Sequence, residues 1–263
     1  MEPWKTAITD VGKDTVRIAG YDIVDLMASR TFTDTIFLLH RGRLPSVAER
    51  RLLDAALVAV ADHGPSAPCA AASRMVATAN RVAPEAAVAA GVLAIGDAHG
   101  GAGLACMKVI ADGLELAKRE GISIEEAATR TVRDFRERRD RLPGIGHRRH
   151  STDPRAQKLF ALARESGVAG EGTAFILAVE KAAAELIKPM PVNIDGALAG
   201  VLHDLGFPPV FGKLVFIIGR IAGLTAHVTE EYLREKAMRI HVPVAYEGPP
   251  PRSLPDESNS DRT

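Results

Sequence analysis

The sequence predicts an all-α fold with a short β-hairpin at its N-terminal end. Apolar residues recur every three to four positions over most of the chain, which is the period of an amphipathic helix. The segments with this period start or stop at Pro, Gly, Ser or Asp, as helices commonly do. With 263 residues and 46% hydrophobic content, the chain can bury a substantial core in one large domain or two modest ones.

The elements follow in chain order from these patterns. Two short β-compatible runs, TAIT and TVRI, flank the turn-like centre DVGKD and predict the hairpin within residues 6–18. Helical periodicity then predicts about eleven helices, over residues 21–29, 32–42, 46–62, 67–81, 84–97, 103–121, 123–141, 153–167, 172–188, 194–206 and 209–238. The motif SIEE at 123–126 has the form of a capping box, and Pro154 stands where a helix would start.

Two of these segments, 84–96 and 210–226, are apolar nearly all round. A helix without a polar face is buried, so we expect both in the middle of the bundle or at a subunit interface. The protein is therefore expected to be a homodimer or a higher homo-oligomer.

Composition argues against several classes of partner. Lys plus Arg (33) equals Asp plus Glu (33), so the overall charge draws the chain neither to nucleic acid nor to an anionic membrane. The two cysteines, Cys69 and Cys106, are too few for a disulfide framework or a cysteine-built metal site. The N-terminal stretch lacks the pattern of a signal peptide, and no run of 18 apolar residues occurs. We expect a cytoplasmic protein whose Pro- and Ser-rich tail, 247–263, is disordered.

Four histidines stand at helix edges in Gly-rich surroundings: His63 in ADHGPS, His99 in GDAHGGAG, His147 in GIGHRRH and His227 in GLTAHV. Glycine permits close backbone approach to a ligand, so a histidine at such a junction is a candidate pocket residue. For each histidine taken alone, a hydrogen-bonded structural role is the alternative.

The loop PGIGHRRHSTDPRA, residues 143–156, has the composition of a binding loop for a metal, a phosphate, a nucleic acid or a polycarboxylate. Two arginines separate His147 from His150 and oppose a divalent cation, and no HExxH motif occurs, so we predict no metal. The Gly-rich GDAHGGAGLA enters a helix whose N-terminus favours anions, but it lacks the GK[ST] of a P-loop. Eight arginines between positions 130 and 149 suggest nucleic acid, yet acidic residues interrupt them at helical spacing, which also fits a solvated, ion-paired face.

Acid–base chemistry on a carboxylated substrate is the remaining alternative. Histidines exchange protons with oxygen near neutral pH, and arginines clamp carboxylates. Asp195 in PVNIDGALAGV stands in an apolar stretch, where desolvation should raise its pKa. The same residue could instead be the N-cap of the helix that follows.

Five motifs occur together and in order: ADHG, GDAHGGA, GIGHR with DPRA, VNIDG and GRIAGLTAHVTE. In this order they resemble the citrate synthase superfamily, and more closely its citryl-CoA lyase branch, the module found alone or at the C-terminal end of ATP-citrate lyase. The resemblance covers about Asp25 to His241. It implies the compact form of a citrate-synthase-like fold over residues 1–246, with a large helical core and a small lobe over about 100–200.

The resemblance also implies roles for residues that match these motifs. His99 would stabilise the enol or enolate of the thioester, Asp195 would move the proton at the acetyl methyl carbon, and His147 would contact the hydroxyl or keto oxygen of the four-carbon half. The carboxylates of that half would be bound by His63, Arg155 and Arg220. Coenzyme A would approach Gly100, Gly101, Gly144, Gly146 and Arg148, the last of which has plain surface charge as its alternative.

One position departs from the family pattern. In the family, a further arginine from the partner subunit precedes a proline near the C-terminus, whereas here Val242 precedes Pro243. Arg239, in the stretch MRIHVPVAY, is the candidate replacement for this carboxylate-binding arginine.

The expected reaction is cleavage of (3S)-citryl-CoA to acetyl-CoA and oxaloacetate through an enolate. The resemblance implies neither a metal nor a tightly bound cofactor, and the coenzyme A thioester is the substrate. Two alternatives stay open: a citrate-synthase-like condensation of an acyl-CoA with a 2-oxo acid, and a non-catalytic relative that binds CoA or a carboxylate. The sequence does not separate citryl-CoA from a branched homologue.

Overall fold

The structure is a computed structural model that describes residues 2–146 and 153–254. Within these ranges it contains eleven helices and one three-stranded sheet, which confirms the predicted all-α class. Strand β1 (Thr9–Val11) pairs antiparallel with β2 (Val16–Ile18), as the predicted hairpin requires. A third strand, β3 (Tyr21–Asp22), then pairs with β2, so the hairpin is part of a slightly larger sheet.

Each predicted helical segment overlaps one helix of the structure. In chain order they are α1 (Ile23–Ser29), α2 (Phe32–Arg41), α3 (Val47–Val60), α4 (Pro68–Ala79), α5 (Pro84–Leu93), α6 (Ala102–Glu120), α7 (Ile124–Arg138), α8 (Pro154–Glu165), α9 (Glu171–Leu186), α10 (Ile194–Asp204) and α11 (Phe211–Arg234). Most boundaries lie within two residues of the prediction, and three helices end earlier than predicted by three or four residues. The fifth ends at 93 rather than 97, the seventh at 138 rather than 141, and the last at 234 rather than 238.

Side-chain caps explain several helix starts. The Asp22 carboxylate accepts from Val24 N at 2.9 Å and begins α1, which is why residues 21 and 22 remain available to the sheet. Ser123 accepts from Glu126 N at 3.1 Å, so the serine half of the predicted capping box is present. Glu126 turns instead to Arg130, whose Nε lies 2.9 Å from its carboxylate. Pro154 occupies the first turn of α8 as predicted.

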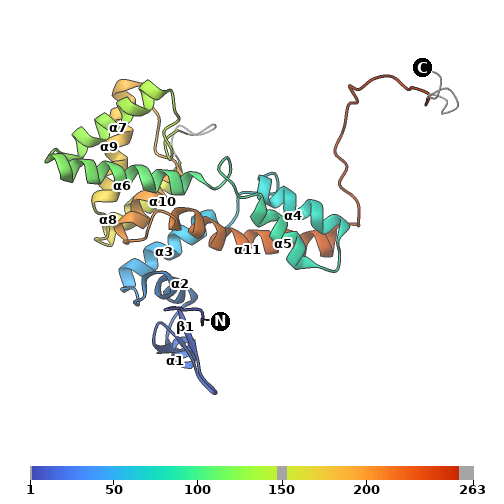
Figure 1. Cartoon of the computed structure of the whole chain (residues 1–263), viewed down its shortest axis with the longest axis horizontal. Helices are drawn as coiled ribbons and strands as arrows, with labels where there is room; N and C mark the ends of the chain where they lie inside the picture. The colour runs from blue at the N-terminus through green and yellow to red at the C-terminus, as the bar shows by residue number, and fades with distance from the viewer. Residues whose placement is uncertain (1, 147–152, 255–263) are drawn as a thin grey trace.

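The long helix α11 joins the two groups of helices (Figure 1). Its C-terminal half packs against α4 and α5, and its N-terminal half contacts α3 and α6. Helices α6, α7, α9 and α10 pack on one another, with α8 against α10. One hydrophobic cluster runs through most of these elements, and its fully buried aromatic residues include Phe37, Phe175 and Phe211. A separate small lobe over about 100–200 stays a prediction.

The two all-apolar segments differ in burial. Among the described residues, only α11 is long and apolar enough to span a membrane, but half of its apolar window is buried in this fold, as in a core helix. In α5 only Ala87 and Gly91 are buried, and Leu93 at its end is 85% exposed. Helix α5 therefore does not lie in the middle of the helical bundle, and its burial at a subunit interface stays a prediction.

Helices α6 and α9 approach closely at Gly113. A Cβ atom at this position would overlap the ring of Phe175, which is completely buried. Because protein interiors are close-packed, this ring has little room to move aside. The missing side chain at position 113 therefore sets the distance between the two helices.

We expect Gly113→Val to destabilise the fold by about 1–3 kcal/mol, the usual effect of overpacking a core. Urea unfolding followed by circular dichroism measures the change. Glu115→Val is the matched control, because it introduces the same residue on the exposed face of the same helix. Equal stability of the two variants would contradict the packing argument.

Candidate active site

His99 lies in the tight loop between α5 and α6. Its backbone is closed into a turn by two hydrogen bonds with Gly96, Gly96 N to His99 O at 2.9 Å and His99 N to Gly96 O at 3.2 Å. Gly100, at φ +81°, follows; a Cβ there would lie 2.7 Å from the ring of Phe216 on α11. Gly101 makes a similar close approach to Gly96 O, at 2.7 Å. These glycines let the loop pack directly against its neighbours and fix the histidine between them.

The His99 ring packs against an apolar side chain. It meets Phe216 edge to face, with 5.9 Å between the ring centroids. Its Nε2 atom is buried and has no hydrogen-bond partner among the described residues, which is costly unless a ligand supplies one. Burial, together with the positive charges of Arg220 and His63, holds the pKa of His99 below its usual value. A neutral imidazole with an unfilled bond is suited to hydrogen-bond a substrate oxygen.

Arg220 is a buried cation on α11. It is 2% exposed, donates from Nε to Val60 O at 2.8 Å and from Nη1 to Cys69 Sγ at 3.2 Å, and stacks over Phe216 at 4.5 Å from the ring centroid. Within residues 2–146 and 153–254, no carboxylate lies within 4.0 Å of its guanidinium nitrogens. A buried charge without a counter-ion is unfavourable, so an anionic ligand fits this position.

Asp195 occupies the first turn of α10 but does not cap it. The cap is Asn193, whose Oδ1 accepts from Asp195 N at 2.9 Å and from Gly196 N at 3.2 Å. The alternative that Asp195 is the N-cap is therefore wrong. Burial raises the pKa of Asp195, and the charge of Asp153 adds to the rise, while Arg155 and Arg220 oppose it. Among the described residues, no hydrogen bond or ion pair holds the Asp195 carboxyl group, and burial disfavours its charged form.

The loop before the gap in the described residues is anchored to the same helix end. Gly146 N donates to Pro191 O at 2.7 Å, and Asn193 Nδ2 donates to Gly146 O at 2.8 Å. Gly144, at φ +79°, packs so closely that a Cβ would lie 2.7 Å from Gly196 Cα. The predicted CoA-binding glycines of this loop therefore also bring it against the helix that carries Asp195.

Arg155 is positioned by Asp153. The Asp153 carboxylate is 1% exposed and binds Arg155 Nε at 3.1 Å and Nη2 at 2.9 Å; it also accepts from Ile194 N at 3.2 Å. Although burial alone would raise it, the hydrogen bonds and charge of Arg155 hold the pKa of Asp153 below its usual value. The ionised Asp153 thereby joins the start of α8 to the start of α10 and holds the arginine near Asp195.

His63 lies in the exposed loop between α3 and α4, close enough for its charge to act on His99. The charge of Arg220 acts on both His99 and Asp195, so five predicted residues form one electrostatic cluster: His63, His99, Arg155, Asp195 and Arg220. His147 and Arg148 lie outside the described residues, so their predicted roles stay predictions.

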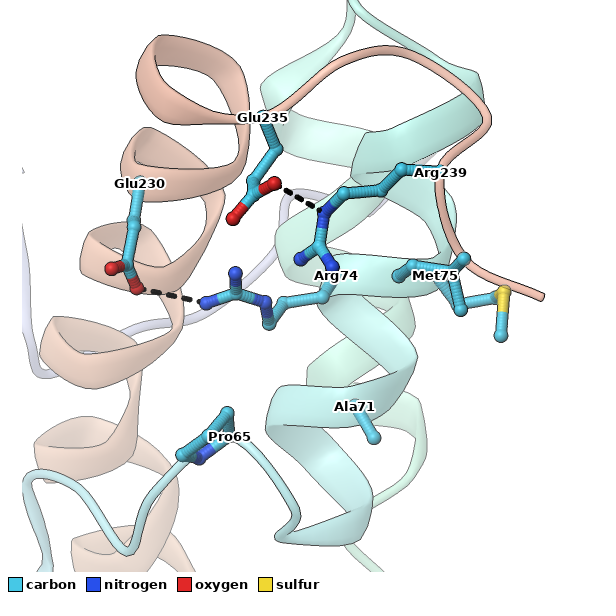
Figure 2. A pocket seen from close by; sticks show the side chains of 8 residues that line it. Pro65, Ala71, Arg74, Met75, Glu230, Glu235 and Arg239 are labelled. Carbon is cyan, nitrogen blue, oxygen red and sulfur yellow. Dashed lines mark hydrogen bonds and ion pairs between the residues drawn. The ribbon is translucent and has the colours of Figure 1, made fainter. Parts of the chain in front are cut away.

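Arg239 is placed elsewhere. It pairs with Glu231, at 2.8 Å from Nε, and with Glu235, at 3.0 Å. Figure 2 shows it beside Arg74 at the edge of a cavity of about 520 Å³ between α4 and the end of α11. Glu231 is eleven residues beyond Arg220, which corresponds to about 16 Å along the helix. Within its own chain, Arg239 thus does not join the cluster around Asp195.

The structure bears on two alternatives from the sequence, nucleic-acid binding and metal binding. Two of the described arginines in this stretch are ion-paired: Arg130 with Glu120 at 2.6 Å and with Glu126, and Arg138 with Asp140 at 3.4 Å. This arrangement supports the solvated face rather than a nucleic-acid surface. Among the described residues, no group of three or more His, Cys, Asp or Glu side chains is arranged to hold a metal ion.

Sequence reasoning missed the residues that hold the site in place. Asp153 and Pro154 form a recognisable cap and first-turn pair, so the Asp153 signal was available. Asn193 precedes Asp195 by two positions and is equally good as a cap. The contacts of Arg220 with Val60 and Cys69 join residues about 150 positions apart, and no local pattern indicates them.

Comparison with known proteins identifies relatives of this chain. The family model described as "Citrate synthase, C-terminal domain" matches residues 47–241. Citrate synthase 2 of Bacillus subtilis is 29% identical over 75% of the chain and 51% of its own length. Putative citrate synthase 2 of Mycobacterium tuberculosis H37Rv is 33% identical over 76% of the chain and 52% of its own length. The chain thus spans about half the length of these curated relatives.

Two solved structures share the fold. Citryl-CoA lyase from Hydrogenobacter thermophilus superposes with a TM-score of 0.89 and 38% identity, covering 97% of this chain and 98% of the other. ATP citrate lyase from Methanothrix soehngenii, in complex with citrate and coenzyme A, superposes with a TM-score of 0.74 over all of this chain and 44% of the other. Its identity of 21% supports a common fold alone.

The raised pKa of Asp195 predicts a stability effect that depends on pH. The unfolded carboxyl has a pKa of about 3.9, so the folded state disfavours its charge as pH rises above that value. We expect Asp195→Asn to be more stable than the parent at pH 7.5, by about 0.5–2 kcal/mol, and the gain to disappear near pH 4. Urea unfolding at both pH values measures this. Asp14→Asn, at an exposed turn, is the control, and a destabilised Asp195→Asn at pH 7.5 would contradict the assignment.

Proposed function

Because the chain belongs to the citrate synthase family, we propose that it is a citryl-CoA lyase, which cleaves citryl-CoA to acetyl-CoA and oxaloacetate. The higher identity with the Hydrogenobacter lyase than with the two synthases supports the lyase branch. The proposal rests mainly on two buried polar groups. Among the described residues, Nε2 of His99 has no hydrogen-bond partner, and the guanidinium of Arg220 has no carboxylate partner. A substrate that brings a thioester oxygen and a carboxylate supplies both partners.

Substrate binding would use the cationic side of the cluster. Arg220 and Arg155 provide guanidinium groups for the carboxylates of the four-carbon half, and His63 adds a further donor. Arg220 is already held by Val60 O and Cys69 Sγ, and Arg155 by Asp153, so little side-chain freedom is lost when the substrate binds. The glycines at 100, 101, 144 and 146, with Arg148, would contact coenzyme A.

Cleavage would begin with loss of the proton from the tertiary hydroxyl, in which His147 would assist. The oxygen then forms the ketone of oxaloacetate as the adjacent carbon–carbon bond breaks, and its electron pair passes to the acetyl-CoA enolate. Negative charge develops on the thioester oxygen, where a hydrogen bond from His99 would stabilise it. The reaction is complete when the enolate carbon takes up a proton.

Asp195 would supply that proton. Burial raises its pKa, so the acid form is better populated near neutral pH than for an exposed aspartate. The same group would remove a proton from acetyl-CoA in the opposite direction. This reversibility is why condensation of an acyl-CoA with a 2-oxo acid is the second candidate, and the identity with citrate synthases favours it specifically.

The thioester is the substrate, and the proposed reaction requires no further cofactor. We also propose that the protein acts in the cytoplasm as a homodimer, without a nucleic-acid or membrane partner. In a dimer, Arg239 of one protomer would have to exchange its bonds to Glu231 and Glu235 for the substrate in its partner's site, to take the role that the family assigns to an arginine in this region.

The direction of reaction is tested with a small panel of thioesters. We expect citryl-CoA to yield oxaloacetate and acetyl-CoA, followed by coupled reduction of oxaloacetate, with Asp195→Ala as the inactive control. If citryl-CoA is untouched while acetyl-CoA and oxaloacetate release free CoA, the protein is a synthase. If it binds acetyl-CoA and converts no member of the panel, it is a non-catalytic relative.

The role of His99 predicts a large kinetic effect. We expect His99→Ala to lower kcat by about 10²–10³-fold, the usual effect of removing one oxyanion donor. Steady-state cleavage of citryl-CoA measures it. His40→Ala is the matched control, since His40 is an exposed histidine that packs on Phe211 outside the cluster. A His99→Ala variant with unchanged kcat would rule out the proposed role.

A further inference from the structure

One face of α11 packs against the loop that contains His63. Gly219, Gly223 and His227 recur every four residues and so share this face. A Cβ at Gly219 would lie 2.8 Å from Leu57 O, and a Cβ at Gly223 would overlap Ala61 O. The end of α3 and the following loop therefore rest directly on the backbone of α11.

His227 completes this contact with a side chain. Its Nε2 lies 3.0 Å from Asp62 Oδ1, and its Nδ1 lies 3.3 Å from Arg74 Nη1. A guanidinium can only donate, so Nδ1 must accept and the proton resides on Nε2. His227 therefore donates to Asp62.

Asp62 passes this restraint to the backbone around His63. Its second carboxylate oxygen accepts from Gly64 N at 3.0 Å, and Gly64 has φ +84°. Although burial alone would raise it, hydrogen bonds from the backbone of Gly64 and His63 and from His227 hold the pKa of Asp62 below its usual value. The ionised Asp62 carboxylate thus restrains the backbone on either side of His63.

The other side of His227 contacts a partly buried ion-pair network. Arg74 binds Glu230 at 2.8 Å and Glu231 at 3.0 Å, and Glu231 is completely buried. Figure 2 shows Arg74 reaching from α4 toward Glu230 on α11. Both glutamates that bind Arg74 are on α11, so the guanidinium that donates to His227 Nδ1 is fixed relative to that helix.

We propose that His227 is a positioning residue that acts through Asp62 to keep His63 aimed at the substrate carboxylate. The inference rests on the proposed function, in which His63 binds the four-carbon half. His227 does not itself touch the reacting atoms: its side chain is only 11% exposed, and it lies seven residues, or about 10 Å along the helix, beyond Arg220.

The test compares binding of the two halves of the substrate. We expect His227→Ala to weaken oxaloacetate binding roughly tenfold, as when a charge-assisted hydrogen bond is lost, and to leave CoA binding unchanged. Calorimetry on the purified full chain measures both, and citryl-CoA cleavage should show a raised KM with a smaller change in kcat. Thr229→Val is the control, because among the described residues the Thr229 hydroxyl bonds only to Thr225 O of its own helix, at 2.9 Å.

Rescue by an isostere distinguishes positioning from general packing. The amide nitrogen of glutamine reaches the place of Nε2, whereas that of asparagine reaches only the place of Nδ1. We expect His227→Gln to recover most of the oxaloacetate affinity and His227→Asn to recover little. Equal recovery by both, or by neither in variants that melt at the parental temperature, would overturn the proposal.

A double-mutant cycle tests the route through His63. If His227 acts through His63, adding His227→Ala to His63→Ala has no further effect beyond about twofold. Multiplicative losses would show that His227 acts independently and would overturn the inference. A parent protein that cleaves citryl-CoA, with His227→Ala unaltered in oxaloacetate affinity, overturns the inference alone. A parent that neither cleaves citryl-CoA nor binds oxaloacetate overturns the proposed function and the inference with it.

Discussion

The buried guanidinium of Arg220 is the interaction on which the rest of the site depends. From the middle of α11 it donates to the end of α3 and to Cys69 at the start of α4, so one side chain joins three helices. The same charge lowers the pKa of His99 and limits the rise at Asp195. Because a buried cation favours a nearby anion, the pocket is electrostatically complete only when a carboxylate enters. The packing of three helices and, in the proposed function, the binding of a substrate carboxylate therefore rely on one group.

Around this cation, structural and chemical duties are divided between neighbouring residues. Asn193 caps α10, and Asp153 joins the starts of α8 and α10 while it orients Arg155. Asp195 stands two positions after the cap; its pKa is raised, and within residues 2–146 and 153–254 its carboxyl group makes no structural bond. In the proposed mechanism Asp195 changes charge when it donates its proton, and because it does not cap α10 it can do so without loosening the helix end.

The helices could be predicted from the sequence because apolar periodicity and helix boundaries are local signals. Strand β3 could not, since a two-residue strand is too short to show alternation and Asp22 also caps α1. The candidate site residues came from motifs, and the structure gathers five of them. Their supports could be predicted only in part: Asp153 and Asn193 stand at recognisable cap positions, but the pairing of Asp153 with Arg155 does not follow the usual three- or four-residue helical spacing, and His227 meets Asp62 across 165 positions. Residues that hold a site are specified by the tertiary fold, which single motifs do not encode.

The two cysteines carry a further consequence. Cys69 on α4 and Cys106 on α6 are both completely buried, and burial together with Asp195 raises the pKa of the Cys106 thiol. A thiol in this state reacts with an alkylating reagent only when its surroundings open. Each cysteine is thus an intrinsic reporter of local opening, one beneath Arg220 and one beneath Asp195. The ratio of their labelling rates would reveal whether the two sides of the cluster open together or one at a time.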